Sequence, residues 1–450
     1  MNFYKENEET IQKTKQILDT DKLNAYFESI NKTLKNMKNI IQYDLQLGSH
    51  LNFEYGITNN NFGSVYSPVG ISDEISGNAT VIWDNGTVSL IDLDYDKIIR
   101  FPELIDFFKS LSYPEKFLPR LPENQSIVPY KSFDPELFER IYSREFPLFQ
   151  NMGQNFKLLK KPESDFVNIA ADYSLSYELY GNSKNINIQK IYTSNSFSYE
   201  VDSLVFQHIL SHLLFDQKKI DSSFTPFHNF FINLKKTTSE KINNENIVLL
   251  PSALYPLLSF YLGYNMNGQN IYYKKSQFSL EDFDSGRKIS NKAFNLLFNP
   301  TLDWEMSSYC LSSSGLTPET GYYIKEGKMT QPSIDLKASA MLNRKPNNGF
   351  GGGKTIFEPV DDTLINYLEK TGDFYLVFGF LGLHTQDPLS GNFSLSVSTG
   401  LLKQKGKIRG LTKANVSGNI FDLLKEGSFK ILENGYDEKF SMVFPMKANN

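Results

Sequence analysis

The 450-residue sequence predicts an α+β fold, in which N-terminal helices accompany an antiparallel sheet and the C-terminal domain is rich in β-strands. Two observations lead to this prediction. Apolar residues first recur at helical spacing and then alternate in short runs, and Gly-containing turns separate most of the later runs. The length allows two or three domains, and we expect them at residues 1–115, 116–238 and 239–450.

The N-terminal part predicts two helices followed by a small antiparallel sheet. Glu6–Leu18 and Lys22–Met37 carry apolar residues at mixed three- and four-residue spacing. From Ile41 to Leu93 the pattern changes to short alternating runs. Within them, Asp84-Asn85-Gly86 lies between two β-rich runs and is typical of a hairpin turn.

The middle of the chain also mixes helix and strand. Leu104–Leu111 predicts a helix, and Ser112–Ser132, which contains four prolines, predicts a connection between subdomains. Pro135–Phe149 predicts another helix with Asp134 as its N-cap. Strand-like alternation then returns from Phe166 to Phe206, so we expect an α+β central region.

The C-terminal domain is expected to begin after a polar linker, Ser239–Asn246. Ile247–Leu262 is apolar but contains Pro251 and Pro256, which argues against a single undisturbed helix. Most of the remainder, from about Ile271, consists of short strand-like runs with Gly turns, and it predicts a β-rich domain.

Composition and charge exclude several classes of function. The 46 basic and 51 acidic residues are spread along the chain, whereas nucleic-acid binding requires a concentrated basic surface. Met1–Lys15 is polar and has no apolar signal core, which predicts a cytoplasmic protein. The apolar run Phe374–Leu383 is much shorter than the roughly 20 residues of a membrane span, so a buried strand is expected. We therefore expect neither nucleic acid nor a membrane as a partner.

Two histidines, His208 and His212, form an i, i+4 pair that could meet on one helix face, as in half of a zinc motif. However, no Glu follows His208, and the neighbouring apolar residues fit a strand as well as a helix. A structural role for both is the favoured interpretation, and an unfamiliar metal site is the alternative.

Two other features have unremarkable explanations. The run Asn348–Thr355 is rich in glycine, but Asn348 stands where a phosphate-binding loop needs its first glycine, so a flexible loop near a cavity is favoured over an ATP site. Cys310 is the only cysteine and can form neither an internal disulfide nor a site of several thiolates. Its neighbours Tyr309 and Leu311 indicate buried packing rather than a nucleophile.

The C-terminal region contains an ordered set of Gly turns. The set comprises Gly382-Leu-His-Thr-Gln-Asp-Pro-Leu-Ser-Gly-Asn-Phe-Ser394, Gly400, Gly406-Lys-Ile408 and Val416-Ser-Gly-Asn-Ile420. Together these segments resemble the C-terminal signature of the TldD/PmbA peptidase family. There a Ser/Thr-Gly-Asp/Asn-aromatic-Ser turn follows a strand, and a Gly-Asn precedes a short helix. Three earlier turns fall in the family's order: Asp84–Gly86, Gly181–Ser183 and Tyr323–Met329.

The resemblance implies a cytoplasmic peptide-processing complex, in which a metal-bearing TldD-type subunit pairs with a PmbA-type subunit around an enclosed cavity. Metal-bearing members carry His-Glu-x-x-x-His and a later Cys, which can hold a catalytic metal. The corresponding stretch here, Leu254–Leu262, has neither His nor Glu, and no Cys follows Gly427. We therefore expect a PmbA/TldE-like subunit without a metal or other cofactor of its own. Its partner is expected to be a TldD-like subunit holding a metal, zinc by expectation, or a second copy of this chain.

The candidate substrate-binding site is the turn formed by Ser390, Gly391, Asn392, Phe393 and Ser394. Its flanking strand could offer backbone groups to an extended peptide by strand addition, or the segment could be only a β-turn that needs Gly391 for its backbone angle. We expect no catalytic residue in this chain. The leading hypothesis is a non-catalytic subunit of a metallopeptidase complex. The alternative is a peptide-binding or scaffolding homodimer without hydrolysis.

Overall fold

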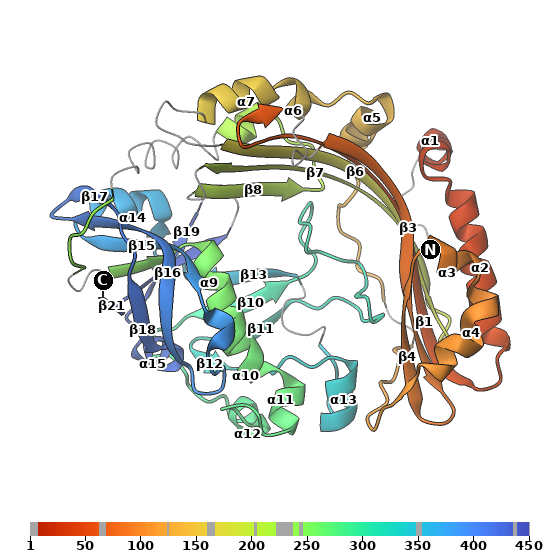
Figure 1. The fold of residues 1–450 in the computed structure, drawn as a ribbon. Coiled ribbons are helices and arrows are strands. Elements are labelled where there is room, and N and C mark those ends of the chain that lie inside the picture. The colour runs from red at the N-terminus through yellow and green to blue at the C-terminus, as the bar shows by residue number, and fades with distance from the viewer. Residues whose placement is uncertain are drawn as a thin grey trace.

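The structure is a computed structural model that describes residues 8–62, 69–123, 126–159, 167–201, 205–221, 237–242, 246–347, 353–434 and 439–449. Two large β-sheets dominate it (Figure 1). The strongly curved N-terminal sheet has helices on its convex side, and the C-terminal elements lie on its concave side. The described chain combines helices with antiparallel and mixed sheets, and this confirms the predicted α+β class.

The first two helices agree with the predicted ranges. They are α1 (Glu8–Leu18) and α2 (Thr20–Asn36). The buried residues Leu23, Phe27 and Ile30 of α2 recur every three or four positions, and together they pack toward the N-terminal sheet. The helical spacing of apolar residues in the sequence therefore corresponds to one buried face of the helix.

The N-terminal sheet contains eight strands of the described chain in the order β5-β4-β3-β1-β6-β7-β8, with β2 beside β1. Its strands are β1 (Ile40–Thr58), β2 (Asn61–Phe62), β3 (Val69–Trp83), β4 (Thr87–Leu93), β5 (Tyr113–Pro114), β6 (Val167–Asn182), β7 (Asn187–Val201) and β8 (Val205–Ser211). Every pairing is antiparallel, and β3 and β4 form the hairpin predicted at Asp84–Gly86. The predicted break at Gly181–Ser183 begins two residues early, because β6 continues to Asn182.

The two faces of the N-terminal sheet differ in polarity. In β1, Leu45 and Leu47 are fully buried in the apolar cluster shared with the helices. Residues of the opposite parity are polar, and His50 Nδ1 lies 2.9 Å from Ser176 Oγ on the neighbouring strand. Because side chains alternate along a strand, all the polar residues of this parity lie on the concave face.

Four further helices cover the convex face: α3 (Tyr95–Ile99), α4 (Phe101–Ser110), α5 (Pro135–Ser143) and α7 (Met152–Leu159). The prediction of one continuous helix over Pro135–Phe149 is wrong. A second helix, α6 (Pro147–Gln150), follows a break at Arg144, which has a left-handed backbone with φ 57° and ψ 38°. Pro147 disfavours helical geometry in the residue before it, which explains the break. The Asp134 cap is confirmed, since its Oδ1 accepts a hydrogen bond from Glu136 N at 3.0 Å.

The C-terminal region contains two sheets. The C-terminal sheet proper has nine strands of the described chain: β9 (Asn246–Leu249), β14 (Asp362–Thr363), β15 (Phe374–Leu381), β16 (Asn392–Gln404), β17 (Lys407–Leu411), β18 (Asn415–Asn419), β19 (Lys430–Glu433), β20 (Phe440–Phe444) and β21 (Lys447–Asn449). A smaller sheet comprises β10 (Asn295–Asn299), β11 (Gly321–Lys325), β12 (Lys328–Met329) and β13 (Lys354–Glu358).

The centre of the C-terminal sheet is buried on both faces. Along β15, Phe374 and Leu376 belong to the apolar cluster that extends from the N-terminal sheet, whereas Tyr375 and Val377 belong to a second cluster within the C-terminal region. All four side chains are 0% exposed. The expectation that Phe374–Leu383 forms a buried strand is confirmed for this first half; the strand ends at Leu381, which is 60% exposed.

The apolar run after β9 forms a helix that changes type. It begins as α9 (Pro251–Leu258), continues as one π-helical turn (Ser259–Gly263) and ends as α10 (Tyr264–Met266). The expectation that no undisturbed helix would form is therefore confirmed. The remaining helices are α11 (Gly268–Tyr272), α12 (Leu280–Asp284), α13 (Leu336–Leu342), α14 (Leu364–Lys370) and α15 (Ile420–Glu426).

Part of the Gly-rich run, Asn348–Gly352, lies outside the described residues.

None of the helices that the structure describes combines the length and the apolar character that a bilayer crossing requires.

Candidate functional site

The turn at Ser390–Ser394 has a backbone that only glycine fits at its second position. Gly391 has φ +73°, and a Cβ added there would lie 2.3 Å from Cδ2 of Phe421. The turn is entered through Asp387, whose Oδ1 and Oδ2 accept hydrogen bonds from the backbone N–H groups of Leu389 (3.0 Å) and Ser390 (3.2 Å). The backbone conformation at position 391 therefore requires glycine.

Asn419 connects this turn to helix α15. Its Nδ2 donates to Ser390 O at 3.0 Å and to Asn392 Oδ1 at 2.9 Å. Its Oδ1 accepts from the N–H groups of Phe421 and Asp422, and so caps the helix. The structure thus places the Gly-Asn of the C-terminal signature directly against the Ser-Gly-Asn-Phe-Ser turn, although about 25 residues separate them in the sequence.

The backbone groups of the turn already have partners. Tyr261 Oη donates to Asn392 O at 2.9 Å, and Ser394 N donates to Gln386 Oε1 at 3.1 Å. On its other side, the first part of β16 pairs with β18. A peptide adding at Asn392 or Ser394 would therefore have to displace a side chain.

A free strand edge lies nearby, on β15. Its pairing with β9 ends at Val377 opposite Leu249, where the chain of β9 turns into α9. Gly379–Leu381 continues beyond that point and pairs with β16 on one side only among the described strands. This short edge is the part of the sheet beside the turn that can accept another strand.

The helix at the position of the family's metal motif is packed into the core. Leu254, Leu257 and Tyr261 are 0% exposed, and Leu262 is 1% exposed. The only polar group that this stretch directs at the turn is the Tyr261 hydroxyl. Burial raises its pKa to about 12, and it already donates to Asn392 O. Apolar side chains and a bonded phenol are not ligands that a divalent metal prefers, so these buried side chains do not fit one.

The π-helical turn at Ser259–Gly263 lies at the position of the same metal motif. The two histidines of His-Glu-x-x-x-His are five residues apart. On an α-helix such residues point about 140° away from each other, whereas a π-turn brings them toward one face. This chain thus has the helix geometry that suits the motif without having its ligands.

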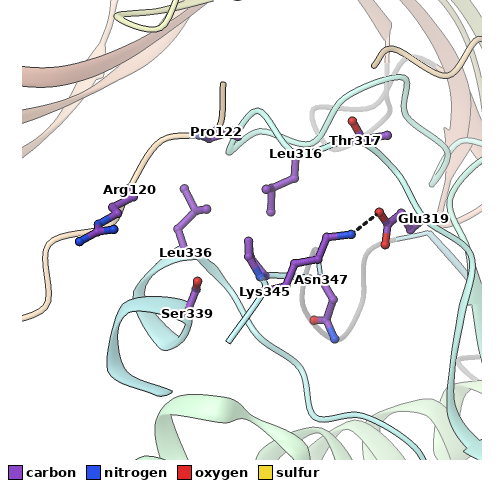
Figure 2. A pocket seen from close by; sticks show the side chains of 10 residues that line it. Arg120, Pro122, Leu316, Thr317, Glu319, Leu336, Ser339, Lys345 and Asn347 are labelled. Carbon is purple, nitrogen blue, oxygen red and sulfur yellow. Dashed lines mark hydrogen bonds and ion pairs between the residues drawn. The ribbon is translucent and has the colours of Figure 1, made fainter. Parts of the chain in front are cut away.

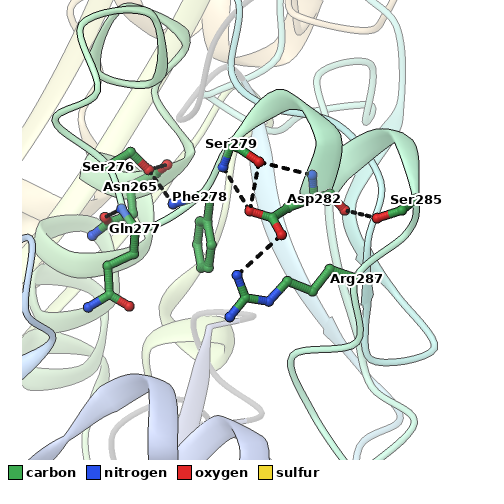
Figure 3. A network of polar contacts seen from close by, with 8 residues as sticks. All are labelled: Asn265, Ser276, Gln277, Phe278, Ser279, Asp282, Ser285 and Arg287. Atoms are coloured by element: carbon green, nitrogen blue, oxygen red, sulfur yellow. Dashed lines mark hydrogen bonds and ion pairs between the residues drawn. The ribbon is translucent and has the colours of Figure 1, made fainter.

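A fully buried amide, Asn265, joins this helix to the turn, and its contacts with Ser276 and Gln277 are drawn in Figure 3. Its Nδ2 donates to Tyr261 O at 2.9 Å and to Pro388 O at 2.7 Å, and its Oδ1 accepts from Gln277 N at 2.8 Å. The adjoining segment is held by the capping box of α12, in which Ser279 and Asp282 bond reciprocally and Asp282 also pairs with Arg287. The bond to Pro388 O fixes the entry to the turn, and the bonds to Tyr261 and Gln277 hold the Asn265 amide in place.

The two histidines considered as metal ligands lie in the N-terminal sheet. His208 is within β8 and His212 follows its end, so the strand interpretation is correct and the helical one is wrong. His212 is 2% exposed, its Nδ1 lies 2.7 Å from Thr193 O, and burial lowers its pKa to about 4. Within the described residues, no three His, Cys, Asp or Glu side chains are grouped so that they could hold a metal ion.

Cys310 is buried beside Tyr130 and Tyr180, as its neighbours in the sequence predicted. Burial raises the pKa of its thiol, which disfavours the thiolate that a nucleophile needs.

Sequence reasoning missed Tyr261, Asn265 and Gln386. The first two stand out in retrospect as polar residues four apart in an otherwise apolar run, a spacing that places both on one side of a helix. Gln386 has no comparable signal, because its role depends on where the chain turns after β15.

The fold and the site define a class: an α+β protein whose mixed C-terminal sheet holds a Gly turn against a π-bearing helix. Comparison with known proteins agrees. Residues 243–439 match the model of the PmbA/TldA metallopeptidase C-terminal domain. The match covers somewhat less than half of the chain, and it agrees with the resemblance of the C-terminal region to the TldD/PmbA family.

Solved structures share the fold over almost the whole chain. TldE from Thermococcus kodakarensis is 15% identical with a TM-score of 0.74, and the match covers 95% of this chain and 100% of that one. A proposed modulator of DNA gyrase from Bacteroides thetaiotaomicron is 17% identical with a TM-score of 0.73, covering 96% and 99%. At these identities the structures show a common fold and nothing further.

One curated relative is also similar in sequence. An uncharacterized protein of Methanocaldococcus jannaschii is 22% identical over 286 residues, or 59% of this chain. The match spans 66% of that relative, just under two thirds of its length.

Proposed function

We propose that this chain is a PmbA/TldE-like, non-catalytic subunit of a cytoplasmic metallopeptidase complex. It would pair with a TldD-like subunit that carries the metal, and its C-terminal sheet would form part of the cavity that receives a peptide or an unfolded protein. The match of residues 243–439 to the PmbA/TldA metallopeptidase C-terminal domain supports the class of complex, and the residues of this chain support the division of roles.

The proposal rests mainly on the side chains of the helix at Leu254–Leu262, where metal-bearing members of the family are expected to have their metal motif. Its buried side chains, Leu254, Leu257 and Leu262, are used for packing, and the Tyr261 hydroxyl is used to hold the turn in place. A helix that elsewhere would present metal ligands here supports a neighbouring loop. This favours a structural contribution to a cavity over hydrolysis within this chain.

The peptide is proposed to lie along β15 rather than on the turn itself. The edge at Gly379–Leu381 lacks a second strand among the described residues, whereas Asn392 O and Ser394 N are engaged by side chains. Strand addition at this edge would place the peptide next to the Ser390–Ser394 turn. The turn would then act as a wall of the site and not as its hydrogen-bonding strand.

Elemental analysis and a mixing experiment test this proposal. The purified chain is expected to hold no stoichiometric metal and to cleave no unfolded peptide. Cleavage is expected only after mixing with a protein from the same host that carries His-Glu-x-x-x-His. Substituting the first His of that partner should abolish the activity of the mixture.

Two results would contradict it. One equivalent of zinc in this chain, lost together with activity in a His208→Ala, His212→Ala variant, would establish a metal site of its own. A stable homodimer that binds peptide, without any cleavage when the partner is added, would instead favour the scaffolding alternative.

A further inference from the structure

Two of the four Asn-Gly pairs in the sequence lie wholly within the described residues, and their surroundings differ. An asparagine before glycine is open to attack by the backbone on its side-chain amide, because glycine has no Cβ to hinder the approach. Asn85-Gly86 forms the tip of the β3–β4 hairpin, where Asn85 is exposed. Asn267-Gly268 begins helix α11, where Gly268 is buried.

The side-chain amide of Asn85 accepts hydrogen bonds from a neighbouring residue that is itself held by a second hydroxyl group. Thr87 Oγ1 donates to Asn85 Oδ1 at 2.7 Å, and Thr87 N donates to the same oxygen at 3.1 Å. Because this bond uses the single proton of the Thr87 hydroxyl, the Ser112 hydroxyl donates to Thr87 Oγ1, at 2.7 Å. Successive hydrogen bonds polarise one another, so the bond from Thr87 to Asn85 is strengthened.

Two donors on Asn85 Oδ1 favour attack at Cγ. Negative charge develops on a carbonyl oxygen when a nucleophile adds to its carbon, and aligned donors stabilise that charge. The nucleophile next to it along the backbone is the nitrogen of Gly86. This nitrogen donates to Trp83 O at 3.1 Å, in an exposed turn, and such turns open more readily than buried structure does.

The corresponding groups of Asn267 are held in a buried segment. Asn267 Oδ1 accepts from the N–H groups of Gln269 (2.9 Å) and Asn270 (3.2 Å), and so caps α11. Gly268 N donates to Ser333 O at 2.8 Å, and a Cβ added at Gly268 would lie 2.9 Å from the same oxygen. A reaction at Asn267 would therefore have to break a helix cap and move packed backbone.

From this contrast we infer that Asn85 is a site of spontaneous deamidation in the folded protein. Gly86 N forms a bond to Asn85 Cγ, the Cγ–Nδ2 bond breaks, and the proton lost by Gly86 N leaves with Nδ2 as ammonia. The product is a cyclic succinimide, which then takes up water. Opening of the ring at Cγ gives aspartate, and opening at the backbone carbonyl gives isoaspartate. The reaction needs only water and does not depend on the proposed function.

The hairpin tip is tied to the Ser112–Ser132 connection and, through it, to the C-terminal region. Glu115 N donates to Gly86 O at 3.1 Å, and the Glu115 carboxylate pairs with Lys337 of α13 at 2.5 Å. Leu336 of the same helix lines a cavity of about 280 Å³ together with Pro122 of the connection (Figure 2). Isoaspartate adds one methylene group to the main chain before Gly86, so it is expected to shift Gly86 O and weaken the bond from Glu115.

The test incubates the full-length chain at mildly alkaline pH and follows the one-dalton mass gain at each Asn-Gly pair by peptide mapping. Asn85 is expected to convert at least about tenfold faster than Asn267, because the reaction at Asn267 must also break the cap of α11. Aspartyl and isoaspartyl products are both expected at position 85. No conversion of Asn85, or equal conversion of Asn85 and Asn267, would overturn the inference.

Variants separate the effect of the hydroxyl groups from that of the Asn-Gly sequence itself. Thr87→Val should slow conversion of Asn85 about tenfold, because it removes the hydroxyl donor and keeps the shape of the side chain. Thr87→Ser keeps the hydroxyl and should convert at the wild-type rate. Ser110→Ala is the matched control, since its hydroxyl bonds to Phe107 O. An unchanged rate in Thr87→Val, with folding checked by circular dichroism, would contradict activation by the hydroxyl groups.

Hydrogen exchange tests the expected consequence for the connection. The Glu115 amide should exchange faster in protein that has accumulated isoaspartate than in fresh protein, because its acceptor Gly86 O has shifted. Asn85→Gln serves as the control, since its longer side chain does not form the five-membered ring, and its exchange should not change on the same incubation. Equal exchange of Glu115 in fresh and modified protein would show that Gly86 O has not moved.

Discussion

The N-terminal and C-terminal sheets are of similar size but are buried differently. The N-terminal sheet is covered by helices on one face and carries polar residues on its concave face, as the alternation of Leu45, Gln46 and Leu47 shows. The centre of the C-terminal sheet is buried on both faces, and four consecutive residues of β15 are inaccessible. Strand pairing alone therefore does not indicate how rigidly a sheet can hold a loop. The turn at Ser390–Ser394 leads into the first half of β16, where Phe393 and Leu395 are buried and Ser394 is exposed, so this end of the sheet is packed from one side.

The largest expected effect concerns the turn itself. Gly391→Val should lower the free energy of unfolding by about 4 kcal/mol, because a left-handed backbone angle and a clash with Phe421 act together. Gly406→Val is the matched control, since Gly406 has φ +71° but open space around it. It should cost only the backbone term, about 1 to 2 kcal/mol. Chemical denaturation measures both.

The same variant tests the role of the turn in substrate handling. With the partner subunit present, Gly391→Val is expected to reduce peptide cleavage while Gly406→Val does not. If Gly391→Val folds, assembles by light scattering and supports cleavage at the wild-type rate, its glycine is only a local backbone requirement.

Substitutions of adjacent residues within one strand test whether the two sheets are buried differently. In β15, Leu376→Ala and Val377→Ala should both destabilise, by about 3 and 2 kcal/mol, because they face different apolar clusters. In β1, Leu47→Ala should cost about 3 kcal/mol, but its neighbour Gln46→Ala less than about 0.5 kcal/mol. A large loss in Gln46→Ala would mean that the concave face is not merely a polar surface.

A buried carboxyl group on β1 predicts a pH dependence. Burial raises the pKa of Asp44 to about 6, and hydrogen bonds from Thr80 only partly oppose this. Because the native state then binds its proton more tightly than the unfolded state, the contribution of Asp44 to stability falls as pH rises from about 4 to about 6. Asp44→Asn should remove this dependence and gain about 2 to 3 kcal/mol relative to wild type at pH 7. Asp73→Asn, at an exposed site on β3, is the matched control for the change in net charge.

The smallest expected effect is the loss of one hydrogen bond to the turn. Tyr261→Phe should cost about 1 kcal/mol, because Asn392 O loses its donor. Tyr264→Phe, three residues away, should be neutral, since the Tyr264 hydroxyl makes no bond with a described residue. Equal losses in both variants would contradict a specific link between the helix and the turn.

The sequence was sufficient for elements whose pattern is local. The helices before residue 37, the hairpin at Asp84–Gly86 and the buried strand from Phe374 all depend on periodicity or on turn residues within a short window. The break at Arg144 was missed because apolar spacing continued across it, although Pro147 was a signal for it. The contacts of Asn265 and Asn419 with the turn could not be predicted, because they join segments more than 25 residues apart and depend on how the strands are ordered.

The apolar cluster shared by the two sheets has a consequence for solubility. Val248, Leu376, Leu432 and Val443 turn one face of the C-terminal sheet toward residues of the N-terminal region. Leu364, Tyr367 and Leu368 of α14 cover part of this face, and N-terminal residues of the same cluster complete the packing. If residues 243–439 were produced alone, the part that N-terminal residues pack against would be exposed to water as an apolar patch, which is a common cause of aggregation. Recognition of a domain in sequence therefore does not make it a unit that can be isolated.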